Sequence, residues 1–383
     1  MKIIIYWEYF QRYHNARLSA LIRLAEKQGH LVLPVSLSEK GHHGHRTERD
    51  PFVDSRAIHL AGKQASRPIN DPVIVDQFVD LLEKERPDVV SIVGWYGRGT
   101  YRILKWAKKN SKKIILLLAG SQHDKRRNPL KEAYKRYFIL SKVDAVLCGG
   151  KPHVRYASRL GMNKSSIFTG YNAVDNDFWA SAGEESRMRS RELADKLGFR
   201  PKQFFVTAGR FIPKKNFEAL IEQYSYYRAQ FCAEPWDLVI VGDGELRPRL
   251  EFKITQLGLN NHVHLPGYLS SEELAPYFGL AGAFVLPSSG FEQWGLVVNE
   301  AMAAGLPVIV STVCGCCEDL VVDGETGFSF SPERMDDLAL AMEKISGDEA
   351  MRDKMASLAA KHIQGYSSDV FATNFLKACK HCK

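Results

Sequence analysis

The sequence predicts an α/β protein built from two doubly wound domains, each with a mainly parallel sheet covered by helices. A chain of 383 residues is longer than a single hydrophobic core usually supports, so two domains are expected. Short apolar runs rich in β-branched residues alternate with helical patterns, as in parallel sheets. The alternation pauses after residue 169 and starts again after residue 200. We therefore expect two domains that face each other across a ligand-binding cleft.

The first half contains five apolar runs that end in small or polar residues, as buried parallel strands do. The expected strands are 3–7, 30–35, 89–93, 113–118 and 145–148, with helices expected at 16–28 and 101–109. Turn-forming residues dominate 170–177, which is the expected junction. A polar stretch at 181–196 fits a surface helix beyond it.

The second half repeats the pattern. Expected strands are 204–208, 238–241, 262–265, 282–287 and 308–311, and expected helices are 216–224 and 244–257. We expect one domain over residues 1–172 and a second over 173–365. A final helix at 366–383 is expected to pack back toward the first domain.

The composition is typical of a soluble globular protein, with 45% apolar and 25% charged residues. No run of 18 apolar residues predicts a membrane-spanning helix, and the first residues do not resemble a secretion signal. Seven cysteines, three of them within 314–317, favour a reducing cytosol over a disulfide framework. We expect a cytoplasmic protein.

The net charge of +8 is concentrated in one segment. Residues 98–142 contain fourteen Lys or Arg against only Asp124 and Glu132, a local charge of +12. Such a block fits an anionic partner, which could be a phospholipid surface, a lipid phosphate, an acidic glycan or a nucleic acid. A solvated helix face is an equally good interpretation.

Two cations follow the expected strand at 204–208. Gly209 allows the backbone to approach a ligand, and Arg210 and Lys215 leave the same loop five residues apart. A diphosphate needs two cations that converge from one side, and an arginine fork with a lysine point charge meets that need. The alternative is a solvated basic loop.

A second anion-binding feature is the helix opened by Gly295 and Leu296, because free amides and the helix dipole favour negative charge there. Glu292 precedes this helix and Glu300 lies within it. Both carboxylates could accept hydrogen bonds from sugar hydroxyls, Glu292 from a hexose and Glu300 from a ribose. A ligand that has a phosphate anion between two sugars is a nucleotide-sugar. The alternative is that both are surface carboxylates.

Glycine turns after other strands agree with this interpretation, although each is weak alone. Gly242 and Gly244 follow one strand, and Gly267 and Tyr268 follow the next. Tyr268 and neighbouring backbone groups could hold a nucleotide base.

Taken in order, these segments resemble the donor-binding domain of retaining GT-B glycosyltransferases, specifically glycosyltransferase family 4. The matching stretches cover about half the chain: 209–215, 241–245, 267–268, 292–300, 305–308 and 318–327. The resemblance implies a GT-B fold with two Rossmann-like domains, the first binding the acceptor and the second the donor.

The resemblance also assigns roles. It implies Arg210 and Lys215 on the donor diphosphate, with the Gly295 and Leu296 amides on phosphate. It places Glu292 near the transferred sugar and Glu300 on the ribose. The implied reaction moves a hexose from a nucleotide diphosphate sugar, UDP favoured over GDP, to an acceptor hydroxyl with retained configuration. No metal or other cofactor is expected.

The first half resembles the family less closely. His123 follows the expected strand at 113–118, where the family often has a histidine near the donor sugar. The family's glycine-rich first turn is missing, and an aromatic loop replaces it. Tyr9 and Phe10 in that loop, with Trp95 and Tyr96, are the candidate acceptor-binding residues, although they could equally pack between domains.

Three clusters resemble metal sites but are not interpreted as such, the first being a turn, the second a polar loop and the third a single cysteine pair at the end of the sequence. They are 175–177, 42–45 and 379–382. The expected partners are a nucleotide-sugar and a carbohydrate, lipid-linked or small-molecule acceptor, with peripheral contact between 98–142 and an anionic membrane as an open alternative. Two rival functions are a sugar-nucleotide epimerase of similar build and a nucleic-acid-binding protein that uses the basic block.

Overall fold

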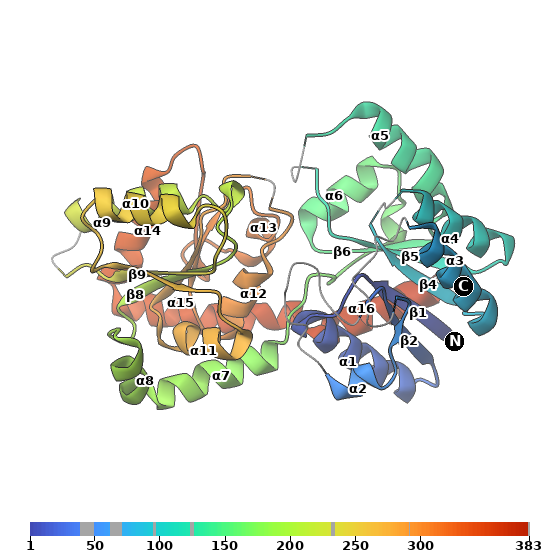
Figure 1. Cartoon of the computed structure of the whole chain (residues 1–383), viewed down its shortest axis with the longest axis horizontal. Helices are drawn as coiled ribbons and strands as arrows, with labels where there is room; N and C mark the ends of the chain where they lie inside the picture. Colours follow the sequence, from blue (N-terminus) through green and yellow to red (C-terminus); the bar gives the residue numbers. More distant parts are fainter. Residues whose placement is uncertain are drawn as a thin grey trace. The chain divides into compact units, whose positions relative to one another are not determined.

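The computed structural model describes residues 1–38, 50–61, 71–94, 97–122, 126–230, 234–290 and 292–381 (Figure 1). The described chain forms two compact units. Unit 1 comprises residues 1–122, 126–175 and 366–383, and unit 2 comprises residues 176–365.

Unit 1 is built on a seven-stranded parallel sheet with the order β3-β2-β1-β4-β5-β6-β7. Its strands are β1 (Lys2–Trp7), β2 (Leu31–Ser36), β3 (Ile58–His59), β4 (Val89–Val93), β5 (Lys113–Leu118), β6 (Ala145–Cys148) and β7 (Ile167–Thr169). Its helices are α1 (Arg12–Lys27), α2 (Pro51–Asp54), α3 (Pro72–Glu85), α4 (Gly97–Lys109), α5 (Pro129–Tyr134), α6 (Lys151–Arg159) and α16 (Ser368–His381).

Both faces of the first sheet are buried, which explains why its strands are continuously apolar. Successive side chains of a strand point to opposite faces. Ile3 and Ile5 in β1 therefore join one core, whereas Ile4 and Tyr6 join the other. Helices α1 and α16 contribute to the first core, and α3, α4 and α6 to the second.

The last helix belongs to unit 1. Helix α16 lies against α1 and the strands β5, β6 and β7 (Figure 1). Phe371 and Phe375 are fully buried in the same core as Ile3 and Ile5. The chain therefore completes the core of its first unit with its final residues.

Unit 2 has a six-stranded parallel sheet with the order β10-β9-β8-β11-β12-β13. Its strands are β8 (Phe204–Ala208), β9 (Asp237–Val241), β10 (Val263–Gly267), β11 (Ala283–Leu286), β12 (Val308–Ser311) and β13 (Gly327–Phe330). Counted from β8, this is the 3-2-1-4-5-6 order of a Rossmann fold.

Helices cover both faces of the second sheet. Within unit 2, α9, α10 and α14 are drawn above the sheet in Figure 1, and α7 and α11 below it. The helices are α7 (Asn176–Met188), α8 (Ser190–Leu197), α9 (Phe217–Gln230), α10 (Arg247–Gln256), α11 (Ser271–Leu280), α12 (Leu296–Ala303), α13 (Cys317–Leu320), α14 (Asp336–Gly347) and α15 (Glu349–His362).

The prediction of two doubly wound, Rossmann-like α/β domains is confirmed. The break between units falls after Asp175, three residues beyond the expected boundary at 172. Ala173 packs in a core of unit 1 and Val174 is also buried, so both stay with that unit. The single helix expected at 181–196 is two helices, α7 and α8. Among the described residues, no helix combines the length and apolar character needed to cross a bilayer.

Candidate functional site

The candidate site lies at the switch point of unit 2, the place where strand order reverses. Strand β8 is flanked by β9 on one side and β11 on the other, so the loops after β8 and β11 leave the sheet in opposite directions. A crevice beyond the carboxyl ends of the strands forms at such a point in open α/β sheets. The loop after β8 carries Gly209, Arg210 and Lys215, and the loop after β11 carries Glu292.

Lys215 and Glu292 form an ion pair across this switch point. The lysine Nζ lies 2.6 Å from Oε2 of Glu292, and the two side chains are only 12% and 10% exposed. Lys214 approaches the other carboxylate oxygen at 3.7 Å and is 31% exposed. The sequence placed Lys215 and Glu292 in one site although 76 residues separate them, and the structure brings their charged groups into direct contact.

Glu292 is held ionised. Burial disfavours its charge, but Lys215, through its charge and hydrogen bond, and then Lys214 outweigh that effect and lower the carboxyl pKa. Ser288 Oγ also donates to Oε2 over 3.4 Å. The Glu292 backbone carbonyl accepts from the Gly315 amide at 3.1 Å. The carboxylate is therefore fixed from several sides.

Glycine is required where neighbouring loops of unit 2 meet. Gly242 has a φ of +136°, and a Cβ there would overlap the carbonyl oxygen of Gly209. Hydrogen bonds also join the loops, from the Gly209 amide to the Val241 carbonyl at 2.9 Å and from the Phe211 amide to the Asp243 carbonyl at 2.8 Å. The loop that carries Arg210 and Lys215 is thereby fixed against the loop after β9.

The turn into α12 is equally tight. Gly295 has a φ of +103°, and a Cβ there would come within 2.7 Å of the Leu286 side chain. Next to it, Trp294 Nε1 donates to Oδ1 of the fully buried Asn299 over 2.8 Å. These contacts fix the start of α12 beside Glu292, as the glycine-led helix predicted from the sequence requires.

The remaining predicted donor-binding residues are more exposed. Arg210 is exposed, and Tyr268 is 62% exposed after β10. Gly244, with a φ of +154°, begins the turn into α10. Leu296 and Glu300 are half-buried on α12. Arg210 and Lys215 share a loop, but their charged groups differ sharply in burial.

Of the candidate residues predicted in the first half of the chain, only Tyr9 and Phe10 lie among the described residues. His123, Trp95 and Tyr96 lie outside the described residues. Tyr9 is half-buried and meets His14 edge to face, with 6.4 Å between ring centroids. The Phe10 side chain is 5% exposed and packs in the hydrophobic core, and its role in acceptor binding stays a prediction.

Two contacts of the site were not predicted from the sequence. They are Ser288 and Lys214, both of which approach Glu292. Ser288 follows β11 and Lys214 adjoins Lys215, so position after a strand was the available signal. Cys314 and Cys316 are buried nearby as free thiols, and burial raises their pKa values, which makes them unreactive.

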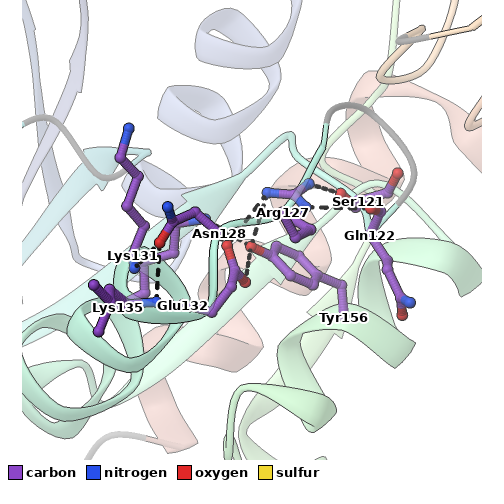
Figure 2. Close-up of polar contacts among 9 residues, drawn as sticks. Ser121, Gln122, Arg127, Asn128, Lys131, Glu132, Lys135 and Tyr156 are labelled. Carbon is purple, nitrogen blue, oxygen red and sulfur yellow. Dashed lines mark hydrogen bonds and ion pairs between the residues drawn. The ribbon is translucent and has the colours of Figure 1, made fainter.

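Unit 1 contains a second polar cluster that the sequence did not reveal (Figure 2). Tyr156 Oη accepts from Arg127 at 3.0 Å and from Lys135 at 2.7 Å, and it donates to Glu132 at 2.7 Å. Arg127 also donates to the backbone carbonyls of Ser121 and Gln122. Within the described residues, no group of three metal-binding side chains is present.

The comparisons with known proteins decide which family unit 2 resembles. The model of the family "Glycosyl transferases group 1" matches residues 189–362, a range that includes the loops carrying Lys215 and Glu292. Residues 189–362 of unit 2 therefore resemble the group 1 glycosyl transferases.

Relatives support the same assignment. The alpha-D-kanosaminyltransferase of Streptomyces kanamyceticus is 32% identical over 178 residues, which is 46% of this chain and 45% of that protein. The chain thus spans about half the length of the curated relatives it matches.

Solved glycosyltransferase structures share the fold of the whole chain. A Rickettsia africae glycosyltransferase has a TM-score of 0.76 at 14% identity, covering 100% of this chain and 98% of that one. Anabaena Alr3699/HepE, solved in complex with UDP, has a TM-score of 0.74 at 16% identity, covering 99% and 100%. The two Rossmann-like units of this chain are those of a GT-B glycosyltransferase fold.

Proposed function

We propose that this protein is a retaining glycosyltransferase that moves a hexose from a nucleotide diphosphate sugar to an acceptor hydroxyl. The observation that carries the proposal is the Lys215–Glu292 ion pair at the switch point of unit 2, within the residues that match the group 1 family model. Lysine provides three donors, one of which is used by Glu292, so two remain for a phosphate. Glu292 offers acceptor oxygens to a sugar.

Catalysis follows from charge. The leaving diphosphate gains negative charge as the glycosidic bond breaks, and fixed cations and amides aimed at it stabilise that state. We assign this role to Arg210, Lys215 and the amides of Gly295 and Leu296. The group 1 match supports the assignment, together with the fixed geometry of both loops. Because the protein supplies these charges itself, we propose transfer without a metal ion.

UDP is the proposed nucleotide. Support comes from Anabaena Alr3699/HepE, which shares the fold and has been solved with UDP and with UDP-glucose. The relatives include a lipopolysaccharide core biosynthesis glycosyltransferase, LpsE of Rhizobium meliloti, which favours an acceptor in cell-surface glycan, glycolipid or glycosylated metabolite synthesis. The cytoplasmic location and peripheral contact with an anionic membrane stay predictions.

A thermal-shift panel of nucleotides tests donor binding. At a ligand concentration of 100 Kd, binding stabilises the folded state by about 2.7 kcal/mol. For a unit of this size we expect the unfolding temperature to rise by about 5–10 °C with UDP, and by less with GDP. Failure of every nucleotide and sugar nucleotide to raise it would contradict the proposal.

Assays on the same purified protein distinguish the proposed function from its two rivals. A sugar-nucleotide epimerase would convert the donor sugar without any acceptor. A nucleic-acid-binding protein would bind DNA or RNA with strong salt dependence, and UDP would leave its unfolding temperature unchanged.

A further inference from the structure

A cavity of about 520 Å³ lies within unit 1. None of its lining residues belongs to residues 189–362, which match the group 1 family model. Helix α5, the π-helical turn η2 (Lys135–Ile139) that continues it, and α6 form its walls. Its lining residues are Gln122, Arg127, Pro129, Glu132, Ala133, Arg136, Tyr137, Tyr156, Arg159 and Leu160. This volume suits a small polar molecule, because ligand pockets typically measure about 300–1,000 Å³.

The charge of the cavity is positive. Arg127, Arg136 and Arg159 line it, and Glu132 is the one acidic residue among the described lining residues. Glu132 is already neutralised, because its carboxylate lies 2.7 Å from Lys135 and 3.7 Å from Arg127. The cavity therefore keeps an excess of positive charge.

Hydrogen bonds fix the Tyr156 side chain at the wall of the cavity. Tyr156 is 2% exposed, and its hydroxyl group is held by Arg127, Lys135 and Glu132 (Figure 2). The Arg127 guanidinium also lies over the Tyr156 ring, 4.4 Å from its centroid. Asn128 caps α5 by accepting from the Leu130 and Lys131 amides. These contacts hold both walls in place without using the other two arginines.

Among the described residues, Arg136 and Arg159 are not paired with a carboxylate, and the Arg136 guanidinium lies over the Tyr137 ring, 5.4 Å from its centroid. Over the residues that the structure describes, neither guanidinium has a hydrogen bond or an ion pair. Arg136 extends toward the end of α6, because a Cβ on Gly161 would lie 3.4 Å from its Nε. Both arginines line the same cavity, and a planar guanidinium pairs with phosphate through two parallel hydrogen bonds.

We propose that this cavity binds a phosphate ester, with the phosphate group on Arg136 and Arg159 and the rest of the molecule against Tyr137. The Tyr137 side chain is 63% exposed at the cavity wall, and the Arg136 guanidinium lies over its ring, 5.4 Å from the centroid, so a group attached to a phosphate on Arg136 would lie beside this ring. The inference does not depend on the proposed transfer reaction, because the cavity lies entirely within unit 1.

The phosphate ester can come from solution or from a lipid headgroup. A cluster of exposed apolar side chains occupies the same helical segment: Leu130, Tyr134, Tyr137 and Phe138. Apolar side chains beside arginines and lysines suit the surface of an anionic membrane. The two sources share the same phosphate chemistry, and binding to a soluble ester or to vesicles distinguishes them.

The test is a calorimetric titration of the full chain with glycerol 3-phosphate, in parallel with sedimentation on phosphatidylcholine vesicles with and without phosphatidic acid. The starting protein carries Arg210→Gln and Lys215→Gln, which remove the predicted phosphate contacts of unit 2. Adding Arg136→Gln and Arg159→Gln should weaken binding about tenfold or more, since each 1.4 kcal/mol of lost interaction is a factor of ten.

The matched control is Arg249→Gln with Arg334→Gln, which removes the same two charges from exposed positions in unit 2 and should leave binding unchanged. Circular dichroism confirms that each variant is folded. Binding of glycerol 3-phosphate that depends on Arg136 and Arg159 supports a soluble ligand. Equally dependent binding to phosphatidic acid vesicles alone supports a lipid. No binding of either, or binding that survives the double substitution, overturns the proposal.

Discussion

Replacement of Lys215 by alanine should lower the affinity for UDP and the turnover of the donor sugar by about two orders of magnitude. Removing one partner of a buried, hydrogen-bonded charge pair costs about 2–5 kcal/mol, and each 1.36 kcal/mol is a factor of ten in rate. The Lys215 side chain is 12% exposed and lies 2.6 Å from Glu292. Its loss removes a cation from the proposed diphosphate site and leaves the Glu292 charge less compensated.

Two readouts avoid the need for an identified acceptor. UDP binding is measured by calorimetry, and donor turnover is measured as release of UDP from the sugar nucleotide. Lys214→Ala is the matched control, since Lys214 is more exposed and lies 3.7 Å from the same carboxylate, so its loss should have a much smaller effect. Wild-type binding and turnover in Lys215→Ala, with an unchanged unfolding temperature, would remove Lys215 from the mechanism.

Replacement of Phe375 by alanine should destabilise unit 1 by about 3–5 kcal/mol, the usual cost of deleting a buried aromatic ring. Phe375 is fully buried in α16, and its ring centroid lies 5.8 Å from that of Phe371. The last helix shares a core with β1 and α1. The space left by the deleted ring should therefore destabilise unit 1, which also contains the first residues of the chain. Urea denaturation followed by circular dichroism measures the change.

The control for this variant is Lys377→Ala on the exposed side of the same helix. It should change the free energy of unfolding by less than about 0.5 kcal/mol. UDP should still protect unit 2 in both variants, because the proposed donor site and residues 189–362, which match the group 1 family model, lie within 176–365. Equal stabilities of Phe375→Ala and Lys377→Ala would contradict the packing of α16 into the core of unit 1.

The fold was readable from the sequence because each strand is buried on both faces. In β5, Ile115 and Leu117 pack on one face while Ile114 and Leu116 pack on the other, so the strand is apolar throughout and ends sharply at small or polar residues. The strand order and the exact junction were less readable, since they depend on pairing between distant segments and on the burial of Ala173 and Val174.

The site was partly readable for a related reason. Lys215 and Glu292 each follow a strand, and parallel strands bring their carboxyl ends to one edge of the sheet. Local pattern did not reveal burial, so Phe10 resembled a ligand contact although it packs in the core. The cluster around Tyr156 was also missed, because Arg127, Glu132 and Lys135 looked like part of a solvated basic segment.

The most direct test of the donor site is a crystal structure of the full chain with UDP. The account predicts that the diphosphate lies at the switch point of unit 2, with its oxygens within about 3.2 Å of donor nitrogens on Arg210, Lys215 and the backbone at Gly295 and Leu296. A nucleotide bound elsewhere, with these groups directed away from it, would contradict the central claim.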